Sequence, residues 1–365
     1  MKILFLAPLT RKIAPQITAS RPRLIFDLIN GLKKRGHKIT VIGTADSKIP
    51  GVKIIPAIKK GFYEIEKSFE NPFYAHISFL IKQALITEKI SHGFDIIHNH
   101  CYPESIPLLL SKNFSCPTIT TLHHSISLEL DEALSMLKNV NIVCTAKSLK
   151  KNAKKTKILK IIPHGVDTNL YKFCKEKEDY LLWVGRLSKS KDKYGNFLDP
   201  KGIKLAIKLA KGTGYKLKLV ANVEDVDFFN KEVKPELSEN IEWVGKISFD
   251  QPLNKRQISK LMQKARALLV TTQKDEGFGL VAVEAQSCGT PVIAFDKKPM
   301  PEIIINGKTG FTVSYKKGLI GLKDALNKLN EINLIDCRKN AENNFSLESM
   351  TKNYEKLYNK LVFKK

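Results

Sequence analysis

The sequence predicts an α/β protein built from two doubly wound, Rossmann-like domains that face each other across a cleft. Three observations support this fold class. The chain has 365 residues, which is typical of two domains rather than one. Short apolar segments alternate with segments of helical periodicity, as in a parallel sheet with helices on both faces. The alternation breaks off in the charged stretch 173–179 and restarts at Tyr180, so we expect domains over residues 1–170 and 171–346.

The first domain is expected to begin with a buried strand at residues 2–8, a short apolar run that ends at Pro8. This run resembles a signal peptide only faintly, because it is short and no small-residue cleavage site follows it. A helix is expected over residues 22–35, since apolar residues recur there at helical spacing and Gly36 ends the pattern. The same reasoning predicts strands at 38–44, 94–100, 117–124 and 141–146, and helices at 72–91, 103–112 and 128–138.

The second domain is expected to repeat this pattern from a strand at 180–186. The Lys- and Asp-rich insert 188–199 separates that strand from its helix and is longer than a usual βα loop. Such an insert is either functional or a dispensable excursion, and the sequence leaves both open. The remaining strands are expected at 215–221, 241–245, 267–272, 291–295 and 310–314, and the helices at 202–211, 226–236, 257–265, 280–288, 318–330 and 347–362.

The chain is strongly basic, with 61 Lys and Arg against 36 Asp and Glu and a formal net charge of +25. Only eight of the 61 are arginine, and the lysines are spread along the whole chain. Base recognition and phosphate forks favour arginine, and no known nucleic-acid-binding motif is present, so no nucleic-acid partner is expected. Two interpretations remain: an ordinary lysine-rich surface, or peripheral attraction to an anionic membrane.

The six cysteines are scattered and none forms a C-x-x-C pair, which argues against a zinc or redox motif. No apolar run approaches the roughly 20 residues that a membrane-spanning helix needs. With no export signal, these features predict a cytoplasmic protein in a reducing environment, and the inner face of the membrane is a candidate location.

One loop carries the clearest chemistry. Ligands of open α/β sheets bind at the carboxyl ends of the strands, and the expected strand 267–272 is followed by a glycine-rich loop that carries Glu276. A helix then begins near Leu280, and its free N–H groups can hold an anion such as a diphosphate. Glu284 lies one turn into that helix. The two carboxylates flank a phosphate site and can accept hydrogen bonds from sugar and ribose hydroxyls.

The segments E-x-F-G-L-x-x-x-E-A (276–285) and C-G-T-P-V-I-A (288–294) resemble the donor-site signature of family 4 glycosyltransferases. The similarity extends over nearly the whole chain in family order. Its further segments are R-G-H (35–37), T-L-H (121–123), I-P-H-G-V-D (162–167), G-R-L (185–187), P-K-G (200–202), P-E-I-I (301–304) and N-G-K-T-G-F (306–311).

The resemblance implies a two-domain GT-B fold, with the C-terminal helix 347–365 crossing back to the first domain. It implies transfer of a sugar from a nucleotide-sugar donor, with retention of anomeric configuration, to a hydroxyl of a glycan or lipid-linked acceptor, as in cell-envelope polysaccharide biosynthesis. Neither a metal nor another cofactor is expected. The donor phosphate would accept the proton of the acceptor hydroxyl, since no dedicated base–nucleophile pair is evident.

The resemblance also assigns roles to single residues. Arg186 and Lys201 match the cations that hold the donor diphosphate, whose negative charge grows as the glycosidic bond breaks. Glu284 matches the residue that binds the ribose hydroxyls, and Glu276 the one that contacts the donor sugar near its reacting carbon. The other matched positions are the backbone N–H groups around Phe278, Gly279 and Leu280, and His123, which would lie over the donor sugar and can touch the acceptor.

Several alternatives stay open at this point. Lys191 competes with Lys201, because the assignment of Lys201 treats 188–199 as an insertion. Family members usually carry Gly-Gly where this chain has Ala19-Ser20, and the extra Cβ atoms should crowd a backbone that comes close to the diphosphate or the acceptor. The rival functions are a nucleotide-sugar-binding protein or partner subunit with little activity, and a nucleotide-sugar epimerase on a similar fold.

Two further motifs favour ordinary structural roles. G-x-G-x-x-A at 277–282, with Asp296 further on, imitates a dinucleotide fingerprint, but a loop of about four residues separates the strand from the glycine where that fingerprint needs a tight turn. H-N-H at 98–100, at a strand end, could suggest a metal or nuclease motif, and either His98 or His100 could line the cleft, but satisfied structural roles are expected for both.

Overall fold

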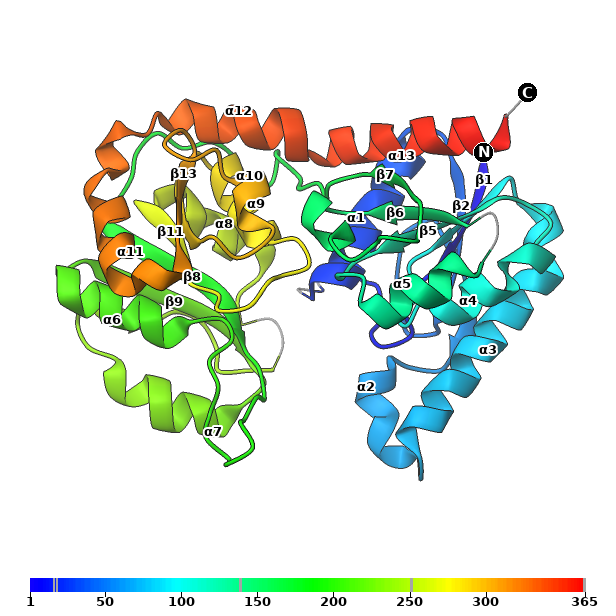
Figure 1. Ribbon diagram of the computed structural model, residues 1–365, viewed down its shortest axis with the longest axis horizontal. Helices are drawn as coiled ribbons and strands as arrows, with labels where there is room; N and C mark the ends of the chain where they lie inside the picture. Colours follow the sequence, from blue (N-terminus) through cyan, green and yellow to red (C-terminus); the bar gives the residue numbers. More distant parts are fainter. Residues whose placement is uncertain (16, 18, 138–139, 250–251, 364–365) are drawn as a thin grey trace. The chain divides into compact units, whose positions relative to one another are not determined.

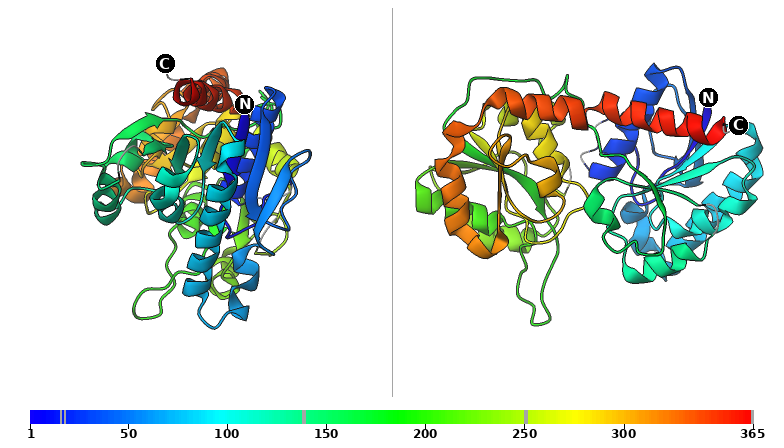
Figure 2. Two further views of the ribbon diagram at one scale, coloured as in Figure 1. Left: turned by 90° about the vertical axis from the view of Figure 1, so that its right-hand side faces the viewer. Right: turned by 45° about the horizontal axis from the view of Figure 1, so that its top comes forward.

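The computed structural model describes residues 1–365 except 16, 18, 138–139, 250–251 and 364–365 (Figure 1). The chain forms two compact units. Unit 1 contains residues 1–165 and 347–365, and unit 2 contains residues 166–346. Both ends of the chain therefore belong to unit 1 (Figure 2).

Unit 1 is built on a seven-stranded parallel sheet in the order β3-β2-β1-β4-β5-β6-β7. The sequence rises from β1 outward in both directions, which is the doubly wound arrangement. The strands are β1 (Lys2–Leu6), β2 (Lys38–Thr44), β3 (Lys53–Ile58), β4 (Ile96–Asn99), β5 (Thr118–Leu122), β6 (Asn141–Cys144) and β7 (Ile158–Ile161).

Helices cover both faces of this sheet, because successive residues of the buried strands point to opposite sides. Ile3 and Phe5 of β1 pack in one apolar cluster with residues of α1 and α13, whereas Leu4 and Leu6 pack in another with Leu80 of α3. The helices of unit 1 are α1 (Ser20–Lys34), α2 (Phe62–Ile65), α3 (Pro72–Ile90), α4 (Ser105–Leu110), α5 (Leu128–Ser135) and α13 (Leu347–Val362).

Unit 2 is built on a six-stranded parallel sheet in the order β10-β9-β8-β11-β12-β13. The strands are β8 (Tyr180–Leu187), β9 (Lys216–Val223), β10 (Ile241–Trp243), β11 (Ala267–Val270), β12 (Val292–Phe295) and β13 (Gly310–Val313). The helices are α6 (Ile203–Thr213), α7 (Val226–Phe228), α8 (Lys255–Lys264), α9 (Leu280–Ser287), α10 (Met300–Ile303), α11 (Gly318–Asn327) and α12 (Leu334–Phe345).

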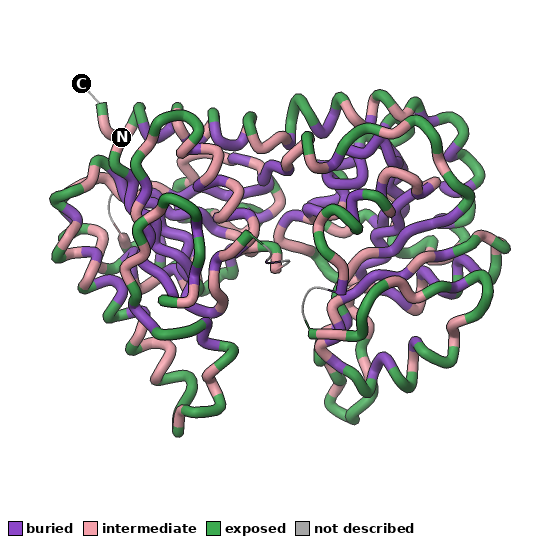
Figure 3. The backbone as a smooth tube through the Cα atoms, turned by 180° about the vertical axis from the view of Figure 1, so that it is seen from behind, coloured by how far each residue is buried: buried purple, intermediate pink, exposed green. Residues whose placement is uncertain are grey.

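The core of each unit is its sheet, and exposed residues lie on the outer turns of the helices and in the loops (Figure 3). In unit 2 the largest fully buried side chain is Trp183 of β8. Its indole N–H donates to Thr271 Oγ1 at 3.1 Å, just beyond β11. A polar atom inside the core thus has a partner, and that bond joins the middle of β8 to the residue that follows β11.

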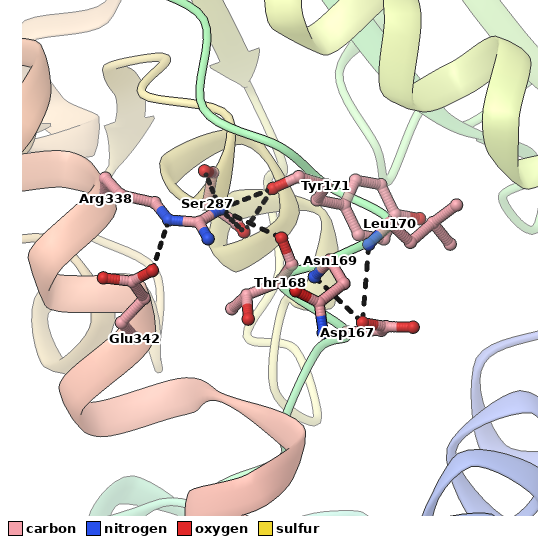
Figure 4. A network of polar contacts seen from close by, with 8 residues as sticks. All are labelled: Asp167, Thr168, Asn169, Leu170, Tyr171, Ser287, Arg338 and Glu342. Atoms are coloured by element: carbon pink, nitrogen blue, oxygen red, sulfur yellow. Dashed lines mark hydrogen bonds and ion pairs between the residues drawn. The ribbon is translucent and has the colours of Figure 1, made fainter.

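A polar network holds the start of unit 2 to its last helix (Figure 4). Arg338 Nη1 of α12 donates to the carbonyl oxygens of Thr168, Tyr171 and Ser287 at 3.1, 2.8 and 2.9 Å. Arg338 Nε donates to Glu342 at 2.7 Å. One guanidinium therefore satisfies two carbonyls of the irregular segment at the start of unit 2 and one at the end of α9. Such backbone acceptors are costly to leave without a partner when buried.

The expected elements are present with boundary shifts, and five of the labelled strands and helices were not expected: β3, β7, α2, α10 and α12. The strand β3 contains Pro56 and lies at a sheet edge, so its pattern is weak. The strand β7 lies at the other edge and alternates little. The helices α10 and α12 were also missed, and the helix expected at 226–236 is α7 followed by a π-helix at 229–233 and a 3₁₀ turn at 234–236. Lys138, the end of a predicted helix, and residues 364–365 lie outside the described residues.

Candidate functional site

Lys201 and Glu276 form the centre of the candidate site in unit 2. Lys201 Nζ lies 2.8 Å from Glu276 Oε1, and their side chains are 28% and 17% exposed. The competing residue, Lys191, lies in the insert, where its ammonium group sits 4.7 Å from the centroid of the Phe197 ring. The structure thus brings Lys201, and not Lys191, to the loop that carries Glu276.

Lys201 is held in place by its neighbours on the backbone. Gly202 has φ +74°, and a Cβ there would overlap the carbonyl oxygen of Thr271. Thr271 Oγ1 in turn donates to the Gly202 carbonyl at 2.6 Å. The approach of residues 200–202 to the end of β11 therefore requires a glycine at position 202.

Asp199, the last residue of the insert, caps the helix that follows Lys201. Its carboxylate accepts the backbone N–H groups of Gly202, Ile203 and Lys204 at 2.8, 3.1 and 2.8 Å. Burial raises the pKa of Asp199, and these three backbone donors oppose the shift. The insert thus ends in a fixed anchor, and an Asp shortly before an expected helix start was the signal that could have identified it.

Arg186 lies at the end of β8 and remains accessible to a ligand. Its side chain is 52% exposed, and Nη1 lies 3.4 Å from Glu224 Oε1, just beyond β9. Solvent screens the half-exposed guanidinium, whereas the Glu224 side chain is only 16% exposed, so the arginine is the partner that can turn toward an anion. Glu224 was not singled out in the sequence, although it follows a strand adjacent to that of Arg186.

The loop after Glu276 leads into α9 through a second glycine with a positive φ. Gly279 has φ +91°, and a Cβ there would overlap Met300 Cε. No side chain among the described residues caps α9, and the N–H of Ala282 donates to the Gly279 carbonyl at 3.0 Å, so it is the first N–H groups of the helix that can donate to an incoming acceptor. Phe278 and Leu280 are buried, and the backbone N–H of Glu276 donates to Lys298 O at 2.7 Å.

Glu284 lies inside α9 and is only 4% exposed. A buried carboxylate is costly unless hydrogen bonds satisfy it. Carboxylate oxygens also accept hydrogen bonds from sugar and ribose hydroxyls, so we expect the replacement of Glu284 to affect ligand affinity more than that of a surface glutamate.

His123 belongs to unit 1 and lies in the middle of a chain of three imidazoles. Its Nε2 lies 2.9 Å from His100 Nδ1, and its Nδ1 lies 3.3 Å from His164 Nε2. Both ring nitrogens of His123 are thus engaged, and the tautomer of one imidazole fixes the tautomers of the other two. The sequence pointed to each of these histidines separately but gave no sign that they would meet.

A second buried network lies beside this chain. His98 Nδ1 lies 2.6 Å from Tyr358 Oη and Nε2 lies 2.8 Å from Thr121 Oγ1, which lies 2.9 Å from Tyr354 Oη. The tyrosines come from α13, so the last helix contributes to the polar interior of unit 1. His98 therefore has the structural role that its strand position favoured.

Burial makes all four histidines poor bases. It lowers the pKa of His98 and of His164 to about 3, and it lowers the pKa of His100 and of His123 well below the ordinary value. The nearby charge of Arg21 adds to the shift for the last three. The folded state thus holds these rings neutral at pH 7.

Unit 1 is expected to lose stability in mild acid. The histidines of the unfolded chain take up protons below about pH 6.5 while the folded rings stay neutral until about pH 3, so unfolding gains about 1.4 kcal/mol per pH unit per histidine within this range. Melting temperatures between pH 7 and pH 4 measure the effect. The melting temperature of His98→Gln should fall less steeply as the pH is lowered. His92→Gln, at an exposed site, should show the same pH dependence as the wild type. An equal pH dependence in all three proteins would contradict the buried neutral state of His98.

The Ala19-Ser20 pair lies at the start of α1. Ala19 is the N-cap residue with φ −57°, a conformation open to any residue, and its carbonyl accepts the N–H of Arg23 at 3.1 Å. The local backbone is therefore unstrained without glycine. Next to it, the Arg21 guanidinium lies 4.6 Å from the centroid of the Tyr102 ring, and no motif in the sequence pointed to Arg21.

Within the described ranges, no group of three or more His, Cys, Asp or Glu side chains is arranged to hold a metal ion. None of the helices in this described part of the chain is both long and apolar enough to cross a membrane.

Comparison with known proteins gives concordant results for both halves. Residues 22–170 match the family described as Glycosyltransferase Family 4, and residues 172–344 match Glycosyl transferases group 1. The uncharacterized glycosyltransferase MJ1178 of Methanocaldococcus jannaschii is 30% identical over 311 residues, which are 78% of this chain and 81% of the relative.

Solved structures show the fold. Sucrose-phosphate synthase from Thermosynechococcus elongatus matches over the whole of both chains, with a TM-score of 0.78 at 16% identity. Anabaena HepE, solved in complex with UDP and glucose, matches with a TM-score of 0.68 at 16% identity over 99% of this chain and all of its own. The two parallel sheets of seven and six strands with their helices are those of the GT-B fold.

Proposed function

Because the chain belongs to the family 4 glycosyltransferases, we propose that it transfers a sugar from a nucleotide-sugar donor to a hydroxyl of a glycan or lipid-linked acceptor. The transfer would retain the anomeric configuration and need no metal. The observation that carries this proposal is the contact between Lys201 and Glu276 at the carboxyl end of β11. It joins a phosphate-type cation and a sugar-type carboxylate at the edge of the sheet where ligands of α/β proteins bind.

The proposed chemistry divides between these residues. As the bond from the sugar to the diphosphate breaks, the leaving phosphate gains negative charge, and Lys201 and Arg186 stabilise it as fixed cations. The acceptor oxygen forms the new bond to the same carbon, and its proton passes to the leaving phosphate. Glu276 orients the donor sugar, and its ion pair keeps Lys201 in position before the donor binds.

The donor would be a nucleoside diphosphate sugar. HepE, which shares the fold, was solved with UDP and glucose, and this supports a donor of that class. The N–H groups at the start of α9 suit the diphosphate, and the buried Glu284 suits the ribose hydroxyls. His123, in unit 1, is the proposed contact to the sugar or the acceptor. To donate there it must give up one of its two imidazole partners.

We further propose that the protein works in the cytoplasm, with peripheral contact to the inner face of the membrane. The net charge of +25 supports this, since basic residues are attracted to anionic lipid surfaces. A lipid-linked acceptor would be found at the same surface, and cell-envelope polysaccharide synthesis is the setting that fits both.

A thermal-shift panel with UDP, GDP, ADP and dTDP, alone and as sugar conjugates, tests the donor site. One base should raise the melting temperature of the wild type, because a ligand that binds only the folded state stabilises it by mass action. At a ligand concentration about 100-fold above its Kd, the gain is about 2.7 kcal/mol. The shift should be lost in Glu284→Ala and reduced in Glu284→Gln, each measured against its own ligand-free melting temperature.

The matched control is Glu239→Ala, at an exposed position of the same unit, which should keep the full shift. A shift that survives in both Glu284 variants would place the nucleotide elsewhere. No shift with any nucleotide would contradict the donor site. A shift without turnover on any acceptor would favour a binding protein or partner subunit, which is the function that Ala19-Ser20 would fit.

A further inference from the structure

A dense group of exposed lysines lies in unit 1, whereas the residues proposed to hold the donor diphosphate and ribose belong to unit 2. The segment 147–157 contains no Asp or Glu. Its exposed lysines are Lys147, Lys150, Lys151, Lys154, Lys155 and Lys157. Six like charges within eleven residues repel one another, so this arrangement lowers stability unless an anionic partner offsets it.

The fold holds this segment in a fixed shape. Asp131 of α5 accepts the backbone N–H groups of Lys154, Lys155 and Thr156 at 2.9, 3.0 and 2.9 Å. Asn152 Nδ2 donates to the Ile126 carbonyl, just before α5, at 3.0 Å. The buried carboxylate thus anchors the backbone of a segment whose lysines are exposed.

Apolar side chains accompany the lysines. Leu128, the first residue of α5, is 61% exposed, and Met136, its C-cap residue, is 79% exposed. Leu128, Glu132 and Met136 follow at intervals of four residues, so they share one face of this short helix, and Glu132 on that face pairs with a lysine of the segment. On α5 itself, Glu132 pairs with Lys155 at 3.3 Å, and Glu129 is exposed. The six lysines still outnumber these two acids.

We propose that this lysine surface, formed by the six lysines with Leu128 and Met136, docks the protein on an anionic phospholipid membrane. Clusters of four to eight basic residues bind such membranes, with about 1 kcal/mol for each lysine near the surface, and exposed apolar side chains add to the affinity by insertion. A nucleic acid would favour arginine and would gain nothing from leucine and methionine. The inference deepens the proposed function, because a lipid-linked acceptor would be presented at this surface.

Vesicle co-sedimentation tests the surface without requiring donor or turnover. Wild-type protein should bind vesicles of phosphatidylglycerol and phosphatidylcholine, should not bind pure phosphatidylcholine, and should bind less at high salt. The variant K150Q/K151Q/K154Q/K157Q should bind at least about tenfold more weakly. The variant L128S/M136S should also bind more weakly while keeping the salt dependence.

The control variant K316Q/K317Q/K323Q/K328Q removes the same number of exposed lysines from unit 2 and should bind vesicles as the wild type does. An equal loss in both lysine variants would show that only net charge matters and would overturn the surface. A second overturning result would be binding that survives in K150Q/K151Q/K154Q/K157Q but is lost on replacing Tyr74, Ile81 and Leu85, which are exposed at helical spacing on α3.

Competition with a short random-sequence RNA separates the partner classes. If RNA binds more tightly than the vesicles, and K150Q/K151Q/K154Q/K157Q also loses RNA binding, the partner of the lysine surface is a nucleic acid and not a membrane. The nucleotide thermal shift is measured on the same variants. If the protein shows the nucleotide thermal shift but does not bind vesicles, the docking surface is wrong and the donor site stands. If it binds vesicles but shows no nucleotide thermal shift, the donor site is wrong and the docking surface stands.

Discussion

Replacing Lys201 by methionine is expected to lower kcat by about 10²- to 10³-fold, the loss typical of removing one preorganised group that stabilises charge in the transition state. Methionine keeps the length and apolar stem of lysine but cannot hold the leaving diphosphate. KM for the donor should rise less, because the phosphate charge grows as the bond breaks. Steady-state kinetics with the donor identified by the thermal-shift panel measures both parameters.

Lys191→Met is the matched control, since Lys191 lies over Phe197 in the insert and does not reach Glu276. Its kcat should change less than about threefold. Equal losses in the two variants would show that the insert belongs to the catalytic site. Because Lys201 and Glu276 are 2.8 Å apart, the double variant K201M/E276Q should lose less than the sum of the single losses.

Gly202→Ala is expected to lower the free energy of unfolding of unit 2 by about 3 kcal/mol or more and its melting temperature by about 5–10 °C. Two costs add: alanine must adopt φ +74°, and its Cβ overlaps the carbonyl of Thr271, which is backbone and cannot move aside cheaply. The contact that positions Lys201 is broken at the same time, so activity should fall even below the melting temperature.

Gly212→Ala provides the comparison within the same helix. Gly212 is exposed in the last turn of α6, and a Cβ there meets nothing within 4 Å. This substitution should leave the melting temperature unchanged or raise it, since alanine is the better helix former by about 0.5–1 kcal/mol. Circular-dichroism melting of both variants measures the difference in melting temperature. A Gly202→Ala protein as stable as Gly212→Ala would contradict the close approach of Gly202 to the Thr271 carbonyl.

The fold class followed from the sequence because buried parallel strands have distinctive apolar runs. The strand at 38–44 was predicted with the bounds that β2 has. The strands β3 and β7 were not predicted because edge strands are partly solvated and lack the apolar run of a buried strand. In β3, Pro56 further weakens the strand pattern. The helix α12 was not predicted because many of its residues are polar and face solvent, and because a 3₁₀ turn at 329–331 lies just before it.

The candidate site was predictable where it follows the chain and unpredictable where it depends on tertiary contact. The loop from Glu276 to Glu284 is local, so its residues could be selected together. The choice between Lys191 and Lys201 needed the structure, because only folding decides which lysine meets Glu276. The contacts of His100 and His164 with His123 arise from three strand ends that are distant in sequence.

The division of unit 1 between the two ends of the chain affects how this protein is made. During synthesis, unit 2 is a continuous segment and can fold as soon as residue 346 has left the ribosome. Unit 1 must wait for α13, whose Tyr354 and Tyr358 fill its apolar interior beside His98. Until then the face of its sheet that α13 covers is open to chaperones and to other nascent chains. A separately expressed unit 1 would accordingly need residues 347–365 fused to it, in an order that the natural chain never presents.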